Sequence, residues 1–442
     1  MMARVVAATT ASAAVLALLL AGTSAPAAAD VDLGGSPVEG TANPAAPTPL
    51  TAGLWSDTVT GPGESPANTL RFSYQRTMEY STVLIGVTGV SAEGAGDGLG
   101  VAVTAPDGTV CDSDETSYPT PGTAFGVSVT VGPDDVDDRD SVCGRAATLD
   151  IAVDRASSDL TSDLPVAIRV VEEAPSVSAV ADLLEPADAP RVALPTPGPP
   201  TTLPGVPSFD EAPEIGNGTY ADEVPQGEQR LYRVRLGWGQ ALAARVDVPG
   251  QTSIEGSYPT VDLTLYDPVR DPVEAAVEET LSDGTYDEDG GRLFEGTPRV
   301  GLLNRFAGQA ATVPGDYWVA VSVSPADPDS EEPAVDVPVE LSVEVTGEED
   351  GAPQFPEFLA GPGGSAAPDG YSLATPYLVG AGVFSADVSG TPSGADATDE
   401  AASGDDARRT AGLAVGGASL LCCAAGVVLL TRRRRVSRAA AR

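Results

Sequence analysis

The sequence predicts an all-β fold: two tandem β-sandwiches, jelly-roll or immunoglobulin-like, on a flexible stalk with one C-terminal transmembrane helix. Three observations predict this arrangement. Short runs that alternate apolar and polar residues recur through residues 47–174 and 213–347, and Gly, Pro and Asp separate them, as in sandwich strands. A proline-rich segment divides these two blocks. Near the C-terminus, twenty uncharged residues followed by arginines are long enough to cross a bilayer.

The first 29 residues have the features of a secretory signal peptide. Arg4 is the only charged residue among them, Val5 to Leu20 is apolar, and three alanines precede Asp30. A basic start, an apolar core and a small-residue site predict cleavage after Ala29, with a second retained helix as the alternative. Residues 30–46 are rich in Pro, Ala and Gly and are expected to form a flexible lead.

The first sandwich is expected over residues 47–174 and the second over 213–347, each long enough for its own core. Between them, residues 175–212 contain closely spaced prolines, which predict a semi-rigid linker. The opening Gly53-Leu54-Trp55-Ser56-Asp57 is repeated as Gly218-Thr219-Tyr220-Ala221-Asp222. Each opening leads to a Gly-Glu turn and then an aromatic strand, so the two blocks are interpreted as a duplication.

Residues 348–410 are expected to form a low-complexity stalk. It includes short strands between Tyr377 and Val388, which we expect to dock on the second sandwich; complete disorder is the alternative. A transmembrane helix is predicted at 411–431 and a basic tail at 432–442. Arginines beside a membrane span remain in the cytoplasm, so we expect a single-pass plasma-membrane protein with an extracellular N-terminus. The arginines that set this orientation are Arg432, Arg433, Arg434, Arg435 and Arg438.

Two cysteines, Cys111 and Cys143, lie in the part of the chain expected outside the cell. An even pair of cysteines in an oxidising compartment predicts a disulfide bond between them.

The second block resembles the bacterial pre-peptidase C-terminal domain family, which consists of β-sandwich appendages of secreted hydrolases. The residues that carry the resemblance are Gly218, Tyr220, Gly227-Glu228, Leu231-Tyr232-Arg233-Val234, Gly239-Gln240, Val261 to Asp267 and Pro314 to Val319. The resemblance implies a noncatalytic module for binding, spacing or secretion, and it extends weakly to residues 47–174. No protease domain precedes either module, so no proteolytic role is expected.

The wider group of such modules includes members that bind calcium through acidic loops. Asp283, Asp287, Glu288 and Asp289 cluster in one turn and are the calcium candidates here, because hard cations take several oxygen ligands. A second acidic loop spans Asp134 to Asp138. The alternative interpretation of both is a solvated acidic loop. No other cofactor is expected.

Composition excludes several kinds of chemistry. The chain has no His, and its 24 basic residues are all Arg. Catalysis by Ser-His-Asp or Cys-His groups, His-ligated metal sites and lysine Schiff bases are therefore excluded within this chain. The formal net charge of −40 disfavours nucleic acid as a partner.

These observations predict a noncatalytic cell-surface protein, anchored in the membrane, that presents two sandwiches for binding or for a structural role in the envelope. A protein or cell-wall partner is expected. The first alternative is the exterior subunit of a membrane-associated secretion or sensing complex. The second is a glycosidase that uses a carboxylate pair, the one enzyme class that the composition leaves open.

Overall fold

The computed structural model describes residues 31–60, 68–92, 96–117, 119–135, 140–155, 162–186, 194–250, 259–273, 290–326, 334–355 and 377–378. All of them belong to the first of two compact units, which comprises residues 1–392; the second comprises residues 393–442. The predicted signal peptide, transmembrane helix and basic tail lie outside the described residues. Within them, no helix is both long and apolar enough to cross a bilayer.

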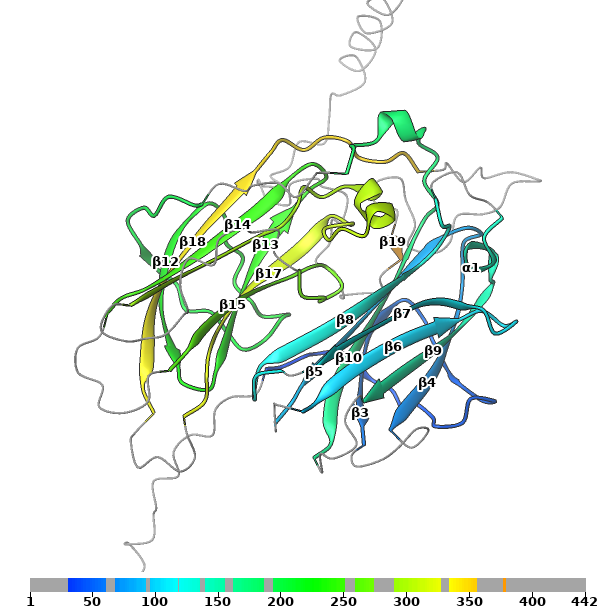
Figure 1. Cartoon of the computed structure of the whole chain (residues 1–442), viewed down its shortest axis with the longest axis horizontal. Coiled ribbons are helices and arrows are strands. Elements are labelled where there is room, and N and C mark those ends of the chain that lie inside the picture. The colour runs from blue at the N-terminus through cyan, green and yellow to red at the C-terminus, as the bar shows by residue number, and fades with distance from the viewer. Residues whose placement is uncertain are drawn as a thin grey trace, which may run out of the picture. The chain divides into compact units, whose positions relative to one another are not determined.

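The described chain is all-β, and its first sandwich contains two sheets (Figure 1). Sheet I consists, in spatial order, of β1 (Ser36–Pro37), β3 (Gly53–Val59), β10 (Leu164–Glu173), β5 (Thr82–Val90) and β8 (Ala124–Val131). Sheet II consists of β2 (Thr48–Leu50), β4 (Thr69–Gln75), β9 (Thr148–Arg155), β6 (Gly98–Thr104) and β7 (Val110–Ser117). One short helix, α1 (Val142–Arg145), precedes β9, and the 3₁₀ turn η1 (Val180–Asp182) follows β10.

The second sandwich also contains two sheets. Sheet III consists of β13 (Gln229–Leu236), β17 (Gly315–Val323) and β15 (Val261–Tyr266). Sheet IV consists of β11 (Thr201–Thr202), β12 (Gly218–Pro225), β18 (Asp336–Thr346), β14 (Ala241–Val248) and β16 (Gly291–Gly296). The 3₁₀ helix η2 (Leu302–Ala307) connects β16 to β17.

Both sandwiches have the same strand order. The order β3-β10-β5-β8 in sheet I corresponds to β12-β18-β14-β16 in sheet IV, and β4-β9-β6 corresponds to β13-β17-β15. Apart from the β6–β7 hairpin within sheet II, successive long strands alternate between the two sheets of a sandwich, as in jelly-roll topology. A short parallel strand, β1 or β11, also pairs with the first long strand of each block.

A hydrogen-bonded feature recurs in the two blocks and supports the duplication. The Gly40 amide donates to Asp57 Oδ2 at 2.7 Å, and the Gly205 amide donates to Asp222 Oδ2 at 2.9 Å. A Cβ atom on either glycine would collide with an aromatic ring, that of Phe72 or of Tyr232. Both glycines are therefore required by close packing at equivalent positions.

The N-terminal segment 31–46 differs from the flexible lead expected from its composition. Val31 and Leu33 are buried, the Asp32 amide donates to the Pro207 carbonyl at 2.7 Å, and β1 pairs with β3. Pairing with existing strand edges satisfies the backbone of this proline- and alanine-rich segment, and its few apolar residues reach a core.

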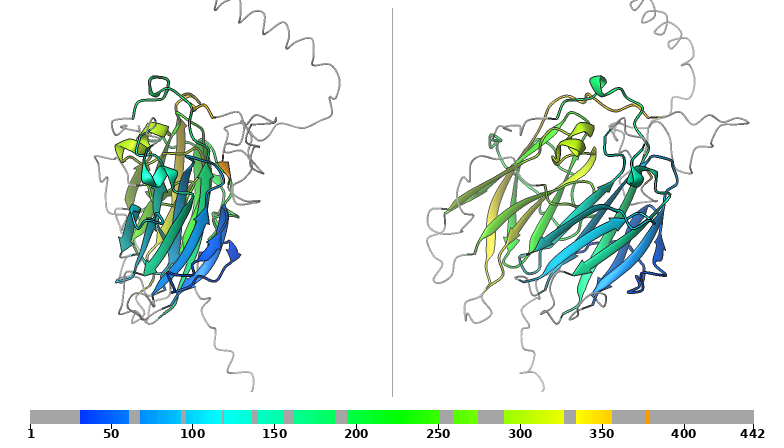
Figure 2. Two further views of the ribbon diagram at one scale, coloured as in Figure 1. Left: turned by 90° about the vertical axis from the view of Figure 1, so that its right-hand side faces the viewer. Right: turned by 45° about the vertical axis from the view of Figure 1, so that its right-hand side comes forward.

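The two sandwiches pack against each other, which the prediction of a semi-rigid linker did not anticipate. The outer face of sheet I contacts the outer face of sheet III, and a hydrophobic cluster joins them. Its members are Val31, Leu33, Leu54, Val90, Ala124, Ala167, Phe209, Ala212, Leu231, Tyr266, Trp318 and Ala320. Phe209 and Ala212 come from the segment expected to be a linker. The sheets therefore stack in the order II, I, III, IV (Figure 2).

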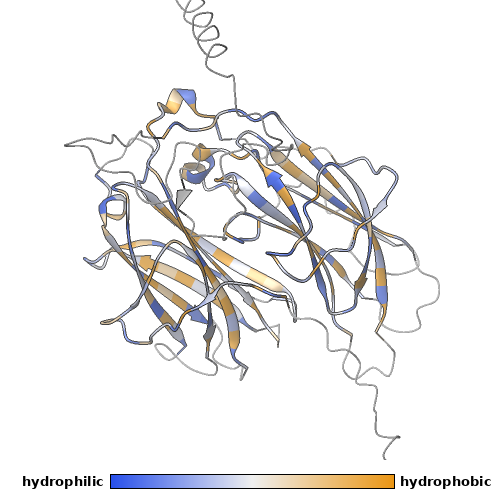
Figure 3. Cartoon of the chain, turned by 180° about the vertical axis from the view of Figure 1, so that it is seen from behind, coloured by the Kyte–Doolittle hydropathy of each residue, from blue (hydrophilic) through white to orange (hydrophobic). Residues whose placement is uncertain are grey.

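This stacking explains which strands are apolar on both faces. Every residue of β5 and of β17 is buried, whereas β7 in sheet II is mostly exposed. Strands covered on both faces have near-continuous apolar runs rather than alternation. Hydrophobic residues accordingly lie along the strands of both sandwiches (Figure 3).

The predicted strand in the stalk also differs from expectation. Tyr377–Leu378 forms β19, which pairs with β10 of the first sandwich, although we expected it to dock on the second. Strand β10 ends with Glu172 and Glu173 at this point, and its backbone offers the partner that the short strand needs.

Candidate functional site

The first feature that could support function is the joint between the sandwiches, where a turn of the second enters the face of the first. The turn follows β15 and spans Asp267 to Asp271. It reaches the backbone of sheet I because Gly86 and Gly126 have no side chains. A Cβ on Gly86 would lie 1.9 Å from the Val269 carbonyl oxygen, and one on Gly126 would lie 2.5 Å from the Arg270 carbonyl oxygen. We call this glycine-lined contact the socket.

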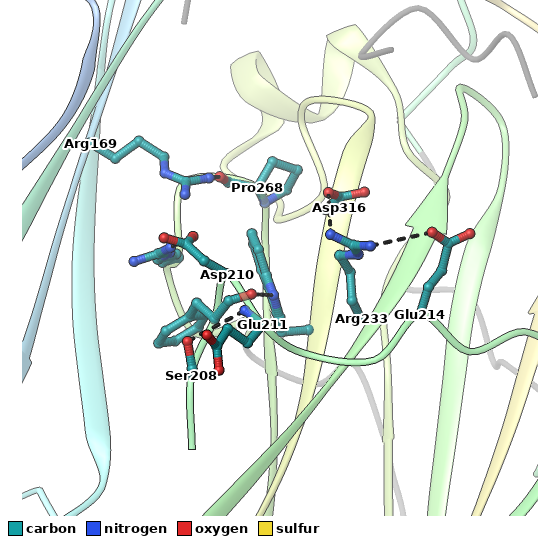
Figure 4. Close-up of polar contacts among 11 residues, drawn as sticks. Arg169, Ser208, Asp210, Glu211, Glu214, Arg233, Pro268 and Asp316 are labelled. Carbon is teal, nitrogen blue, oxygen red and sulfur yellow. Dashed lines mark hydrogen bonds and ion pairs between the residues drawn. The ribbon is translucent and has the colours of Figure 1, made fainter. Parts of the chain in front are cut away.

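Hydrogen bonds hold the turn in the socket. Thr88 Oγ1 donates to the Arg270 carbonyl at 3.4 Å, and Ser128 Oγ donates to Asp271 Oδ2 at 2.9 Å. The guanidinium of Arg169, which is fully buried on β10, donates to the Pro268 carbonyl at 2.8 Å (Figure 4). Burial lowers the pKa of Arg169 to about 10, so this group stays charged at neutral pH.

Arg270, at the tip of the turn, adopts a backbone φ of 68°, which non-glycine residues adopt infrequently. Its guanidinium donates to the Leu33 carbonyl and to Asp210 Oδ1, the latter at 2.8 Å. It also lies 4.4 Å from the centre of the Phe209 ring. A cation over an aromatic face gains about 0.5–2 kcal/mol, and this gain offsets part of the cost of burying the charge.

The joint also contains a buried carboxylate. Asp267 Oδ1 accepts the amides of Val269 and Asp271, both at 2.9 Å, and shapes the turn. Burial raises the pKa of Asp267 to about 6, despite those amides and the nearby Arg169 charge.

Further polar contacts tie the sandwiches at the rim of the joint. Arg305 on η2 forms an ion pair of 2.7 Å with Glu173 on β10, and both side chains are buried. Tyr266 Oη donates to the Ala124 carbonyl at 2.6 Å, and the Ala124 amide donates to Gln229 Oε1 at 3.1 Å. With this number of fixed contacts, we expect the two sandwiches to behave as one rigid body.

The second feature is a pair of grooves, one in each sandwich, beside the parallel edge strand. The larger has a volume of about 980 Å³ and lies on the outer face of sheet IV. It is lined by Thr202, Pro204, Asp222, Glu223, Asp247, Val248, Arg292, Pro338, Val339, Glu340 and neighbours. The smaller, about 740 Å³, lies at the corresponding edge of sheet I and is lined by Pro37, Val38, Asp57, Thr58, Pro165, Val166 and neighbours.

Strand register shows which residues are equivalent in sheets I and IV. On the inner faces, Asp57 pairs with Val166 and Asp222 with Val339, and this match fixes the equivalent positions on the outer faces. The equivalent pairs are Ala167 and Glu340, Thr88 and Asp247, Gly86 and Arg245, and Gly126 and Arg292. The larger groove, which we call the acidic groove, therefore includes part of the surface that corresponds to the socket, at Asp247 and Arg292. The part at Arg245 is covered by the segment that contains Pro195, whose carbonyl accepts a hydrogen bond from Arg245 at 3.4 Å.

Charge in the acidic groove is unevenly compensated. Asp247 accepts from Arg245 at 2.6 Å and from Arg292 at 2.8 Å. Burial would raise the pKa of Asp247, but these two arginines outweigh it and hold the pKa below its ordinary value. Within the described chain no ion pair involves Glu223 or Glu340, and both are exposed.

The residues that the sequence singled out have different outcomes. Cys111 and Cys143 form the predicted disulfide bond, which joins β7 to α1. The calcium candidates Asp283, Asp287, Glu288 and Asp289 lie outside the described residues, as do Arg432, Arg433, Arg434, Arg435 and Arg438. Of the second acidic loop, Asp134 and Asp135 are described. Among described residues, no three acidic or cysteine side chains gather closely enough to hold a metal ion.

The sequence did not indicate the joint or the acidic groove. Gly86 and Gly126 interrupt otherwise apolar strands, and such a glycine often marks the close approach of another backbone. The continuous apolar run of β5 was a second signal for a strand covered on both faces.

Comparisons with known proteins identify no family. No protein-family model matches the chain, and no curated protein matches it in sequence. Among solved structures, the tandem CBM22-1–CBM22-2 domain of Paenibacillus barcinonensis Xyn10C is 11% identical, with 67% of this chain and 92% of that chain covered and a TM-score of 0.16. A secreted protein from Eubacterium rectale is 8% identical over 68% of this chain and 80% of its own, with a TM-score of 0.19. The CUB1-EGF-CUB2 region of human MASP-1/3 is 9% identical over 66% and 99%, with a TM-score of 0.17. The function proposed for this chain therefore rests on its own residues.

Proposed function

We propose that this chain is a noncatalytic cell-surface protein whose two sandwiches form one rigid binding module, anchored by the predicted helix at 411–431. The observation that carries the proposal is the contrast between two equivalent faces. Sheet I uses its outer face to lock the second sandwich in place. On the equivalent face of sheet IV, segment 195–198 covers Arg245 and Thr219, and a groove of about 980 Å³ is open beside it. A fixed module with one open, concave face is suited to recognition.

A role in binding fits the chemistry of the groove better than catalysis does. Asp247 and Glu340 are register partners on neighbouring strands, so the groove does hold two adjacent carboxylates. A glycosidase needs one carboxylic acid with a raised pKa to protonate the leaving group. Asp247 has the opposite environment, because Arg245 and Arg292 keep it ionised.

A rigid joint would let the predicted membrane anchor hold both sandwiches in one fixed orientation. A stalk that ends in a membrane span would hold the sandwiches away from the bilayer, and the joint would keep the open face in a fixed orientation. Binding then incurs little entropy cost for ordering the module itself.

The test is affinity purification from membranes with two forms of the protein, the intact chain and a version that lacks residues 411–442, followed by mass spectrometry. A soluble or cell-wall component that co-purifies with both forms would support a surface binding module. A membrane protein recovered only with the intact chain would instead indicate the exterior subunit of a membrane complex. Recovery of no specific component with either form would refute the proposal.

A further inference from the structure

We propose that the acidic groove on sheet IV receives a turn of sheet II from a second copy of this chain, so that anchored copies stack head to tail. This inference rests on the proposed function, because it names the partner of the open groove. Two observations carry it. The turn that fills the socket has an exposed counterpart in the first sandwich, and the groove corresponds to the part of the socket that this turn contacts.

The first sandwich repeats the turn that enters the socket. Residues Ala105 to Thr109 follow β6 of sheet II, as Asp267 to Asp271 follow β15 of sheet III. In both turns the first amide donates to the fifth carbonyl, at 2.8 Å and 2.9 Å, and the fourth amide donates to the first carbonyl at 2.9 Å. The fourth residue has a positive φ in both, 88° at Gly108 and 68° at Arg270. We call residues 105–110 the free turn.

The free turn ends in an exposed apolar side chain. In the joint, Pro272 pairs with Tyr266, and a Cβ on Gly126 would lie 3.4 Å from the Pro272 ring. Val110 pairs with Thr104 in the same way and is therefore the counterpart of Pro272. Val110 is 62% exposed, the highest value for a large hydrophobic side chain in the described part of the chain. The position that packs on sheet I in the joint is thus open to solvent at the free turn.

The acidic groove corresponds to the part of the socket that meets this turn. In sheet I, Thr88 and Gly126 contact the Arg270 carbonyl, and the Ala124 carbonyl accepts from Tyr266. These residues and two neighbours from the joint all have counterparts that line the groove. The pairs are Thr88 and Asp247, Val90 and Pro249, Ala124 and Gly290, Gly126 and Arg292, and Ala167 and Glu340. The segment at Pro195 covers the adjoining position and leaves this part open.

The arginine in the groove sets how closely the free turn approaches. Arg292 occupies the position of Gly126, so a turn cannot reach the backbone of sheet IV as it reaches that of sheet I. Contact is therefore made between side chains. The groove offers Val110 the exposed ring of Pro249 and the apolar stem of Arg292, and arginine stems commonly pack in this way.

Charged groups on the two surfaces are complementary. Asp107 in the free turn is exposed, and the Arg292 side chain is 46% exposed. A guanidinium has five N–H donors, so Arg292 can bind this carboxylate and keep its bond to Asp247. The net charge of −40 opposes association, but at physiological ionic strength it is screened beyond about 8 Å, so the groups in contact decide the outcome.

Two apolar members of the joint cluster, one on each side, have counterparts of opposite charge. Leu231 of sheet III corresponds to Arg71 of sheet II, and Ala167 of sheet I corresponds to Glu340 of sheet IV. The surfaces that form an apolar joint within one copy are therefore polar where two copies meet. Polar surfaces of this kind are typical of reversible association between proteins that are also stable alone.

Stacking through these surfaces continues the order of sheets within the chain. Sheet I meets sheet III inside one copy, and sheet IV meets sheet II of the next. The two surfaces differ, so the interface is heterologous and extends into a row rather than closing as a symmetric dimer. Copies anchored in one membrane meet at a high effective concentration, which favours a row even when each contact is weak.

The first experiment identifies what lies against the free turn. The full chain, with the photo-cross-linker benzoylphenylalanine at position 110, is reconstituted in phosphatidylcholine liposomes as an equal mixture of isotope-labelled and unlabelled protein. After irradiation and digestion, mass spectrometry identifies the joined peptides. We expect position 110 to be joined to a peptide that contains Pro249 or Arg292, with one labelled and one unlabelled member in half of the products.

The second experiment measures the strength of the contact. Val110→Asp places a charge where an apolar side chain is buried, and it should weaken association of the full chain in detergent at least about tenfold by sedimentation equilibrium. The matched control Val142→Asp changes another exposed valine, on α1, and should alter the affinity by less than about twofold. Thermal unfolding checks that both variants keep the fold.

Three results would overturn the assignment: cross-links from position 110 that stay within one copy or reach another surface, no cross-link at all, and equal weakening by the two valine variants. The membrane purification separates this inference from the proposed function. If Val110→Asp recovers the same soluble or cell-wall component as the unaltered chain while the cross-link to the groove is absent, the binding module stands and the stacking of copies fails.

Discussion

Replacing Gly86 with alanine tests whether the two sandwiches behave as one rigid body. The backbone of Gly86 is in a region that alanine adopts, since its φ is not in the left-handed range, so the change introduces little local strain. The new Cβ would lie 1.9 Å from the Val269 carbonyl oxygen. Ordinary contact requires the turn to withdraw by about 1.5 Å, because nonbonded heavy atoms rest near 3.5 Å.

The energetic cost follows from the contacts that such a shift breaks. The turn receives hydrogen bonds from Arg169 at 2.8 Å, Ser128 at 2.9 Å and Thr88 at 3.4 Å. Each contributes about 1 kcal/mol, and overpacking of a close contact costs about 1–3 kcal/mol. If the shift weakens most of these contacts, we expect Gly86→Ala to lower the free energy of unfolding by about 3–5 kcal/mol.

The assay is differential scanning calorimetry together with guanidinium unfolding. The unaltered chain should unfold in one cooperative transition, and the variant should show two, because each sandwich keeps its own core when the joint loosens. Gly100→Ala is the matched control, since its Cβ would meet only the Asp154 carboxylate, at 3.2 Å, and that side chain can rotate away. A single transition at an unchanged midpoint in Gly86→Ala would refute a rigid joint built on the socket.

The remaining predictions concern buried groups. The pKa of Asp267 is raised to about 6, so its stabilising contribution is complete below pH 3.8 and is lost as pH rises through 6. Asp267→Asn should remove this pH dependence. In urea unfolding, the difference in the free energy of unfolding between the variant and the unaltered chain should favour the variant more at pH 8 than at pH 4, by up to about 3 kcal/mol. Asp97 and Arg155 form a buried ion pair of 2.7 Å, and Asp97→Asn should cost about 3–5 kcal/mol because it leaves a buried guanidinium without its counter-charge; the exposed pair Arg145–Asp140 is the control, and Asp140→Asn should leave the denaturation midpoint unchanged. Replacing Cys111 and Cys143 by serine should lower the free energy of unfolding by up to about 3.7 kcal/mol through loop-closure entropy, and an unchanged midpoint under non-reducing conditions would contradict that account.

The all-β class and the disulfide could be predicted from the sequence because both depend on local or compositional signals. Alternating runs indicate strands wherever one face meets a core, and two cysteines in an oxidising compartment form a pair. The shared openings at Gly53 and Gly218 also placed equivalent strands, β3 and β12, in the two blocks.

The joint could not be predicted in this way because it depends on contacts distant in the sequence. Arg169 and Pro268 are 99 residues apart, and Leu33 and Arg270 are 237 apart. Composition predicted a flexible lead at 30–46 and a semi-rigid linker at 175–212, but composition predicts only how a segment behaves when it makes no tertiary contacts. Here Leu33 and Phe209 find a partner in the cluster between the sheets, and tertiary packing decides the outcome.

The acidic groove could not be predicted from the sequence either, because recognising it requires a comparison of the two duplicated sandwiches. Once a sandwich is copied, equivalent faces begin with the same fold and are separated only by what each one contacts. Sheet I has glycine and alanine where another backbone arrives, whereas sheet IV has arginine and glutamate at the corresponding positions. Side chains of this size and charge on sheet IV prevent the close docking that sheet I makes and leave a concave, charged surface. The difference between the two sandwiches therefore supports the proposal of a binding face on sheet IV, and it is visible only after strand register has aligned them.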